Sequence, residues 1–587
     1  MKQPIGDSGM HLAARKKDHH LVKTMIEAGA QVDTQNNEGQ TVLHVACMMG
    51  DEETVRVLFM ARANAGIPDH EDRVPIHLAA ERGYSRIVEF LADKFKASIY
   101  DRTRDGSTLM HIAAVNGHPE TAMILFERGV PLLMPNRFGA RSIHTAAKEG
   151  HVNVINTLIR KGEHVDTPTG DGLSSLHIAV EHGKAAVVES LLGHGANVHL
   201  KGGQHGETPL HIAARIDEAK GEKCTKMLVQ SGADPNLSMG DGRTSVHIAS
   251  SCGNLMVLRA LLQNGGNAET EDKEGETPLH KACKDCNFHI VRELLQFIRG
   301  FIGHTKSYIN KKNKKGETAL HYASMISKGN LHYPDEDKMI VTLLMESGAD
   351  VTIQTENNHE SAFHYVAFSG NCELLQEMIS HSNQGIVQLA VNKQNSLGWA
   401  PLLAASSRGH KDTVELLLKC NARVDVFDNE GRSALHLAAD CGSLDVCQSL
   451  LDKNAFVNSK SKKGMTALHF ASHKGFTELV DYLVTKHGAS IESLTIKKQT
   501  PMHMAAAAGM LSTIEKLIDL EAMVDFNDEL DQKPIHLAAQ HDHTNVVKKF
   551  LEIRPSLVSS TTKDGNTLAH LAAKKGSVDV LQAMIIL

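Results

Sequence analysis

The sequence predicts an all-α repeat solenoid, in which helix-turn-helix units stack in a row and form a curved superhelix. Three observations lead to this prediction: a short phrase recurs along the chain, a histidine recurs within it, and an apolar helix follows each copy. The chain has 587 residues, more than the roughly 250–300 at which a single globular core stops growing. A fixed period over such a length is typical of stacked repeats, in which each unit buries its apolar surface against the next.

The recurring phrase is seen in GETPLHIAAR at Gly206–Arg215 and in GRSALHLAA at Gly431–Ala439. Seventeen copies align on its histidine, and twelve of the sixteen intervals between them are 33 or 34 residues. One copy carries Leu403 in place of the histidine. The recurring histidines are His11, His44, His77, His111, His144, His177, His211, His247, His280, His321, His364, His436, His469, His503, His536 and His570.

Each copy has the residues of a helix start followed by a second helix. Three residues before the histidine position lies Thr or Ser in thirteen copies, and these side chains cap free N–H groups at a helix N-terminus. Proline follows in copies such as Thr208-Pro209, where it suits the first helical position. Alanine two residues after the histidine position, present in sixteen copies, lets a neighbouring helix approach closely. The segment Ala186–Leu192 then places its apolar residues on one stripe, and Gly195 is suited to the left-handed position after a helix.

This pattern resembles the ankyrin repeat, a unit of about 33 residues with a turn and two antiparallel helices. At the third helical position, the histidine can bond the capping threonine through one ring nitrogen. The resemblance implies that the other ring nitrogen reaches the backbone of a neighbouring repeat. We therefore predict a structural role for the repeat histidines, because catalysis does not need sixteen evenly spaced copies.

The intervals divide the predicted solenoid into three parts of one continuous array. Regular repeats 1–6 occupy residues 1–205, irregular repeats 7–11 occupy 206–397, and regular repeats 12–17 occupy 398–587. In the irregular part, insertions are expected in the turn between helices at Arg215–Cys224 and Ser327–Lys338, after a second helix at Gln296–Glu317, and at His381–Trp399. Insertions in solenoids lie on loops; these could form a docking ridge, reset the curvature, or be tolerated variation.

Composition excludes several functions. The net charge of −7 is weak for this length, so no nucleic acid or anionic lipid partner is expected. No apolar stretch is long enough to span a bilayer, and the first residues lack the apolar core of a signal peptide. The nine scattered cysteines favour a reducing environment. No phosphate-binding glycine motif is present, and we expect neither enzymatic activity nor a cofactor. The apolar end at Met584–Leu587 is expected to be part of a longer array.

Three stretches could carry chemistry or binding. HKACKDCNFH at His280–His289 contains a CxxC that could bind zinc, but Cys283 occupies the small-residue position of the repeat, which favours packing. HESAFH at His359–His364 has one residue too many for the zinc-protease motif. The only notable basic run is a candidate interaction loop for an acidic partner, with a solvated loop as the alternative; its lysines are Lys306, Lys311, Lys312, Lys314 and Lys315.

Longer stretches resemble one family of ankyrin proteins. LADKFKASIYDRTRDGSTLMHIA (Leu91–Ala113), MPNRFGARSIHTAA (Met134–Ala147), GWAPLLAASSRGH (Gly398–His410) and ARVDVFDNEGRSALHLAA (Ala422–Ala439) are similar to the array of the NOMPC or TRPN-type mechanosensitive TRP channels. NKQNSLGWAPLL at Asn392–Leu403 is similar to an irregular repeat of that family.

The resemblance implies a tetrameric, mechanically gated cation channel. Its cytoplasmic array would act as a tether and gating spring between the pore and microtubules, at the plasma membrane of sensory cilia or cell projections. This chain would touch neighbouring repeats but not the membrane. The alternative is an ankyrin-type adaptor that binds membrane proteins on a concave face; an enzyme is a distant third interpretation.

Overall fold

The computed structural model describes residues 6–301, 303–325 and 336–586. Among these residues there are 36 α-helices and one 3-10 helix, and β-structure is limited to isolated bridges. The chain divides into two units, residues 1–273 and 274–587, which are described separately below. The predicted all-α repeat solenoid is confirmed.

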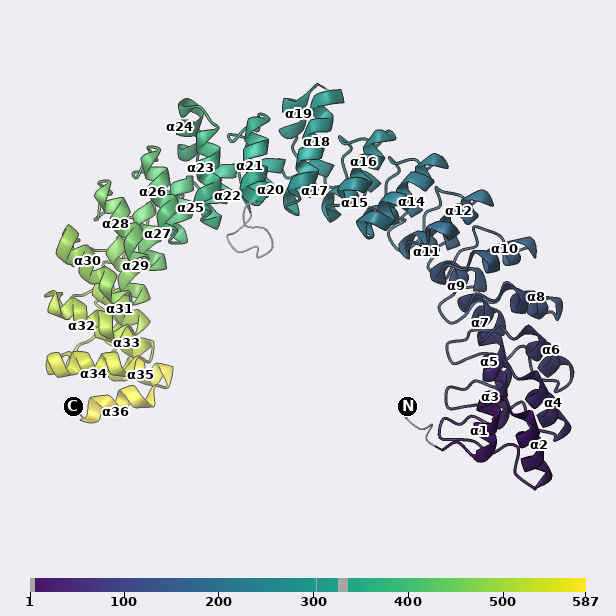
Figure 1. Cartoon of the computed structure of the whole chain (residues 1–587). Coiled ribbons are helices and arrows are strands. Elements are labelled where there is room, and N and C mark those ends of the chain that lie inside the picture. The colour runs from purple at the N-terminus through teal and green to yellow at the C-terminus, as the bar shows by residue number, and fades with distance from the viewer. Residues whose placement is uncertain (1–5, 302, 326–335, 587) are drawn as a thin grey trace. The chain divides into compact units, whose positions relative to one another are not determined.

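Unit 1 contains eight helix pairs, and each pair packs against the next. Within this unit Figure 1 shows the first helices of the pairs in one row and the second helices in another. The first helices are α1 (Gly9–Arg15), α3 (Val42–Met49), α5 (Pro75–Glu81), α7 (Leu109–Val115), α9 (Ser142–Glu149), α11 (Ser175–Glu181), α13 (Pro209–Arg215) and α15 (Ser245–Cys252). The second helices are α2 (His19–Glu27), α4 (Glu52–Met60), α6 (Ser85–Asp93), α8 (Pro119–Glu127), α10 (Val152–Arg160), α12 (Ala185–Gly193), α14 (Glu218–Gln230) and α16 (Leu255–Gln263).

Unit 2 contains nine pairs in the same two-row arrangement. The first helices are α17 (Pro278–Lys284), α20 (Ala319–Ser324), α22 (Ala362–Ser369), α25 (Pro401–Ser407), α27 (Ala434–Cys441), α29 (Ala467–Lys474), α31 (Pro501–Ala508), α33 (Pro534–Gln540) and α35 (Leu568–Lys575). The second helices are α18 (Phe288–Phe301), α21 (Glu336–Glu346), α23 (Cys372–Ser380), α26 (Lys411–Lys419), α28 (Leu444–Asp452), α30 (Thr477–His487), α32 (Leu511–Asp519), α34 (Thr544–Ile553) and α36 (Val578–Ile586). Three further helices are α19 (Thr305–Ile309), α24 (Gln384–Asn392) and η1 (Pro555–Ser559).

The pair α27/α28 shows how the sequence builds a repeat. Helix α27 buries Ala438 and Ala439, whose small side chains let adjacent first helices pack closely. Gly442 ends α27 with φ +78°, a left-handed conformation that glycine adopts without steric cost. The apolar stripe of α28, which includes Val446 and Leu450, is fully buried, and each such side chain contributes roughly 1.5–3 kcal/mol.

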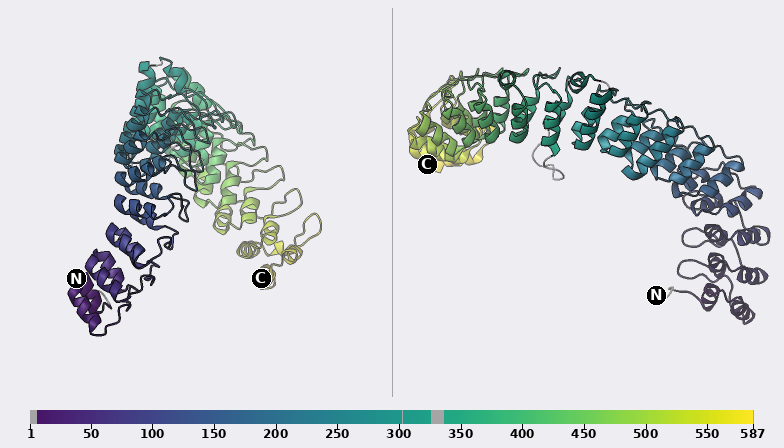
Figure 2. Two further views of the ribbon diagram at one scale, coloured as in Figure 1. Left: turned by 90° about the vertical axis from the view of Figure 1, so that its right-hand side faces the viewer. Right: turned by 45° about the horizontal axis from the view of Figure 1, so that its top comes forward.

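A hairpin-shaped loop connects each pair to the next first helix, and we call this loop the finger. In the finger of residues 428–432, the Asp428 N–H donates to the Arg432 carbonyl at 2.9 Å, and the Asp428 carboxylate accepts from the N–H of Glu430 at 2.9 Å. Figure 2 shows such loops projecting from the helix pairs of unit 2. Fingers are held by local hydrogen bonds, so their tips are free to present side chains.

The insertions are only partly where the sequence predicted them. The expected longer turn at Arg215–Cys224 is wrong, because α14 starts at Glu218 and lengthens the second helix to 13 residues. The segment after α18 forms α19, and the insertion at His381–Trp399 forms α24. The insertion at Ser327–Lys338 lies largely outside the described residues. Within the described part of the chain, no helix combines the length and apolarity that a membrane span requires.

Candidate functional site

The repeat histidines lie at the third position of the first helices, next to the finger of the following repeat. In α3, Nδ1 of His44 accepts from the N–H of Thr41 at 3.0 Å and lies 2.9 Å from the Thr41 hydroxyl. Its Nε2 lies 3.0 Å from the carbonyl oxygen of Arg73 in the next finger. The histidine therefore takes the place of the glutamate in a capping box, and its far edge reaches the next repeat.

The same two contacts recur in both units. In each of the fourteen repeat histidines from His44 to His536, the ring Nδ1 accepts a hydrogen bond from the backbone N–H three residues earlier. The Nε2 atoms reach carbonyls of the following finger as follows: His111 to Ala140, His144 to Thr167, His177 to Leu200 and Glu207, His280 to Lys311 and Glu317, His321 to Glu360, His436 to Ser459 and Met465, His469 to Gln499, His503 to Gln532, and His536 to Ser560.

This geometry fixes the charge of the ring. A backbone N–H can only donate, so Nδ1 carries no proton and Nε2–H donates to the carbonyl. Burial lowers the pKa to about 4 in five of the repeat histidines, since a cation without water is costly: His144, His211, His321, His364 and His469. At pH 7 the rings are therefore neutral and link successive repeats through hydrogen bonds.

Three histidines depart from the pattern. The buried Nε2 of His77 faces the backbone of Asp101, and that of His211 faces the backbone of Leu237 and Arg243, in contacts less well aligned than those of the other repeats. His570 keeps its contact with the Thr567 hydroxyl at 2.8 Å but is exposed. The rings of His77 and His211 are thus buried like those of the other repeats, whereas the ring of His570 is exposed.

Fingers are also linked directly at their tips. In unit 2, a tip N–H donates to a carbonyl of the preceding tip at every one of the eight junctions: Lys314 to Glu274, Glu356 to Lys315, Ser396 to Asn358, Asn429 to Leu397, Lys462 to Glu430, Ile496 to Lys463, Glu529 to Lys497, and Lys563 to Leu530. We call this series the tip ladder.

The tip ladder of unit 1 has two gaps. His70, Arg137, Gly203, Gly240 and Lys273 donate to the preceding tip. The N–H groups of Arg104 and Gly170, which occupy equivalent positions, make no such bond in the described structure. A hollow of about 380 Å³ lies at the first gap, lined by residues including His77 and Arg104.

The lysines of the predicted interaction loop lie on α19 and on the finger that follows it. Lys306 lies on α19, and the carbonyl of Lys311 accepts from His280 in the loop that follows. Lys312 pairs with Glu356 at 3.2 Å, and Lys314 and Lys315 lie at a finger tip. The structure therefore pairs one of these lysines with an acidic side chain, and their role as an interaction loop stays a prediction.

Aligning the fingers reveals a denser basic surface that we missed in the sequence. Five exposed lysines lie on two successive fingers of unit 2, and we call them the lysine patch: Lys460, Lys462, Lys463, Lys497 and Lys498. They are divided by more than thirty residues of chain, so they do not form a run. The sequence could have indicated this surface, because lysines occur at the tips of two successive repeats.

A buried polar cluster links three further repeats of unit 2. The Tyr322 hydroxyl bonds Glu276 and lies 3.0 Å from Glu317, which Tyr365 contacts at 3.3 Å. Burial and the adjacent Glu276 raise the pKa of Tyr322. Burial alone would raise the pKa of Glu276, but hydrogen bonds from Lys281 and Tyr322 outweigh it and lower this pKa. The tyrosine stays protonated and the cluster is a tie between repeats rather than an acid–base site.

The cysteine–histidine stretch has the geometry of packing. Cys283 is fully buried in α17, and Cys286 takes the turn position with φ +59°. Burial, with Asp337 nearby, raises the pKa of the Cys286 thiol to about 12. The residues described in the structure contain no group of three or more potential metal ligands.

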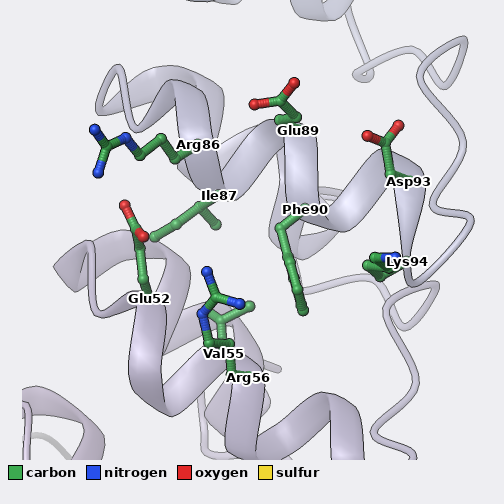
Figure 3. A pocket seen from close by; sticks show the side chains of 9 residues that line it. All are labelled: Glu52, Val55, Arg56, Arg86, Ile87, Glu89, Phe90, Asp93 and Lys94. Carbon is green, nitrogen blue, oxygen red and sulfur yellow. The ribbon is translucent and has the colours of Figure 1, made fainter.

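A groove of about 390 Å³ lies between second helices α4 and α6 of unit 1 (Figure 3). The Arg56 guanidinium lies over the Phe90 ring at 5.2 Å. Glu89 and Asp93 bond Arg128, the residue that follows α8, at 2.7 and 3.0 Å. These charges are engaged with one another and do not converge on the groove, so it offers no set of groups for a substrate.

Comparison with protein families matches the chain to a family model of ankyrin repeats. Segments described as ankyrin repeats (three copies) cover the chain in eleven overlapping matches, at 10–103, 59–136, 76–169, 143–239, 176–273, 216–302, 246–355, 331–428, 363–461, 453–529 and 502–586.

Curated proteins with different printed roles are similar to parts of the chain. Human transient receptor potential cation channel subfamily A member 1 is 27% identical over 425 residues, which is 64% of this chain and 36% of that protein. The E3 ubiquitin-protein ligase KEG of Arabidopsis thaliana is 32% identical over 123 residues, 21% of this chain and 7% of the ligase. The probable 26S proteasome regulatory subunit p28 of Saccharomyces cerevisiae is 30% identical over 239 residues, 40% of this chain and 80% of that subunit. The chain thus spans only about a third of the channel, and the shared feature is the repeat.

Proposed function

The chain belongs to the ankyrin-repeat family, and on that premise we propose that it is the cytoplasmic array of a mechanically gated cation channel of the TRPN (NOMPC) type. In this role it is a tether and gating spring that transmits force between the cytoskeleton and the pore. The role needs no cofactor and no catalysis, since all the work is mechanical.

The observation that carries the proposal is the similarity to a TRP channel over 64% of this chain. The stretches at Leu91–Ala113 and Gly398–His410 add the resemblance to the TRPN type. Identity of 27% supports a channel array in general, and the TRPN assignment depends on those stretches.

The contacts between repeats suit a spring. Within each unit every helix pair packs on the next, and the histidine and tip-ladder hydrogen bonds cross the same junctions. Each junction is a nearest-neighbour contact, so small changes in angle add along the array. A force applied at one end of the array would therefore change the angle at each junction by a small amount, and these changes would add up to a large extension.

The proposal includes the partners that the family resemblance implies. These are neighbouring repeats, microtubules, and three further copies in a tetrameric channel at the plasma membrane of sensory cilia or cell projections. We assign no microtubule-binding residue in this chain.

Sequencing the parent transcript tests the proposal. We expect six apolar spans, each of about 20 residues, downstream of the array. A transcript that instead encodes a spectrin-binding or death domain would contradict the channel and support the adaptor.

The adaptor is the second candidate, because proteins of other printed roles share the repeat. An adaptor would bind membrane proteins through its fingers and first helices. Pull-down with the array as bait distinguishes the two: an adaptor retains membrane proteins at stoichiometric amounts, whereas a spring retains none beyond its own channel.

A further inference from the structure

The lysine patch gathers five positive charges on two neighbouring fingers. None of its five lysines forms an ion pair with a carboxylate among the described residues, and the Lys460 ammonium donates only to the Leu494 carbonyl, at 3.1 Å. The other four are exposed at finger tips. Unpaired like charges repel one another, so the patch is stabilised by any ligand that supplies negative charge.

The two fingers that carry the patch have a fixed relation. The Ile496 N–H donates to the Lys463 carbonyl at 3.0 Å, so the tips lie side by side. The side chain of Ile496 is 68% exposed. In the chain, Ile496 directly precedes Lys497 and Lys498 at the tip of the second finger. An exposed apolar side chain on the same two fingers as the lysines offers a second, non-electrostatic contact.

One lysine is held in an unfavourable backbone conformation. Lys498 has φ +55°, at the tip position where the fingers on its N-terminal side have Gly398, Gly431 and Gly464. Asp, Asn and His tolerate this region better than other L-residues, because their short polar side chains bond locally. Lysine has no short polar group for such a local bond, so Lys498 holds this conformation at a conformational cost.

We propose that the lysine patch binds an extended acidic peptide segment of a partner protein, with an apolar residue of that segment placed on Ile496. Helix pairs pack about 8–10 Å apart, and an extended chain rises about 3.3 Å per residue. Acidic residues at about every third position would therefore face successive fingers. This binding site is independent of whether the array belongs to a channel.

The surroundings favour a short peptide over a membrane or a nucleic acid. Exposed carboxylates lie on the fingers on both sides, at Glu430 before the patch and at Glu529 and Asp531 after it. A bilayer or a duplex would extend over these carboxylates and be repelled. A short segment can remain within the two basic fingers.

The test uses the full chain and a fluorescein-labelled peptide of about seven residues, with two glutamates three positions apart and a leucine between them, so that it fits within the two basic fingers. Binding is followed by fluorescence anisotropy at low salt, where exposed charges are least screened. The double variant Lys463→Gln/Lys497→Gln is compared with Lys486→Gln/Lys548→Gln, which removes the same charge from exposed sites on α30 and α34.

We expect the patch variant to weaken peptide binding about tenfold and the control variant to change it less than twofold. Equal weakening in both variants would show that the peptide follows the overall charge and would overturn the proposal. Unchanged binding in the patch variant would overturn it as well.

Lys498→Gly separates binding from folding. Glycine relieves the positive-φ strain, so the variant should keep or raise Tm while weakening peptide binding about threefold. A lower Tm with unchanged binding would make Lys498 a structural residue and contradict our inference.

Two other probes check the class of partner. Vesicles containing phosphatidylserine and a DNA duplex are titrated with the parent and patch-variant chains. Patch-dependent binding of either probe, without binding of the peptide, would overturn the peptide as the occupant; peptide binding alone supports it.

Discussion

At the scale of single residues, the repeat histidine acts in two places at once. Its Nδ1 caps its own helix and its Nε2 holds the next finger, as in His469 with Thr466 and with the Gln499 carbonyl at 3.1 Å. The ring is fully buried, so both bonds are made away from water. A change at this residue therefore affects two successive repeats.

His469→Ala should destabilise unit 2 by about 1–3 kcal/mol, because the Gln499 carbonyl and the Thr466 hydroxyl lose a buried partner. Urea unfolding measures the loss, and hydrogen exchange should increase in the finger around Gln499. The matched control is His570→Ala, whose ring has the same cap contact but is exposed; it should cost less than about 1 kcal/mol. Equal costs would contradict a stacking role.

Stability should fall as pH falls from about 6.5 to about 4. In this window the unfolded histidines bind protons, whereas the folded rings, with pKa lowered to about 4 in His144, His321 and His469, do not. Each such ring changes the free energy of unfolding by about 1.4 kcal/mol per pH unit. Chemical denaturation at several pH values measures the slope, which His469→Ala should reduce by one proton. A stability that is flat over this range would refute the neutral, buried rings.

At the scale of elements, the turn between the two helices is as specific as the helices themselves. Gly442 is followed closely by the next pair, and a Cβ at this position would lie 2.5 Å from the ring of Phe476. The same turn glycine in the last pair, Gly576, has φ +80°, but a Cβ added there would meet no atom of the described residues within 4 Å. The first glycine is thus required by both conformation and packing, and the second by conformation alone.

Gly442→Ala should therefore lower Tm more than Gly576→Ala. Both variants carry the cost of a positive φ, roughly 1–2 kcal/mol, and only Gly442→Ala adds a clash with a neighbouring aromatic ring. Differential scanning calorimetry compares the two, and an equal loss would show that Phe476 moves aside freely.

The tip ladder makes a prediction about individual amides. The N–H groups of Arg104 and Gly170 lack the bond that His70 and Arg137 make. Their hydrogen exchange should be faster, because exchange follows the opening of a protecting bond. Amide-resolved exchange of the full chain checks this, and equal protection at all four positions would mean that the gaps close in solution.

At the scale of the whole molecule, the helices that share extensive contacts within each unit belong to the same repeat or to adjacent repeats, among the residues that the structure describes. Stability is then close to a sum of repeat and junction contributions, and unfolding can proceed piece by piece. No element is shared by distant repeats within the described part of either unit, so nothing enforces a single cooperative transition.

Pulling on the two ends should give reversible extension at low force and stepwise unfolding of repeats at higher force. Optical-trap measurements on the full chain record the steps. His469→Ala should lower the force of the steps from its own region and leave the others unchanged. A rigid response that ends in one rupture would contradict the nearest-neighbour description and the spring.

The sequence by itself determined the period, the helix pair and the position of the buried histidine, because capping, apolar spacing and turn glycines act within one repeat. It did not determine the start of α14 or the gaps at Arg104 and Gly170 in the described structure. In the sequence, the lysines of the lysine patch belong to two separate segments, and only the stacking of their fingers brings these segments together. These features arise between repeats about 33 residues apart. Which groups meet there depends on how the repeats pack in three dimensions, and the residue pattern within one repeat does not specify that packing.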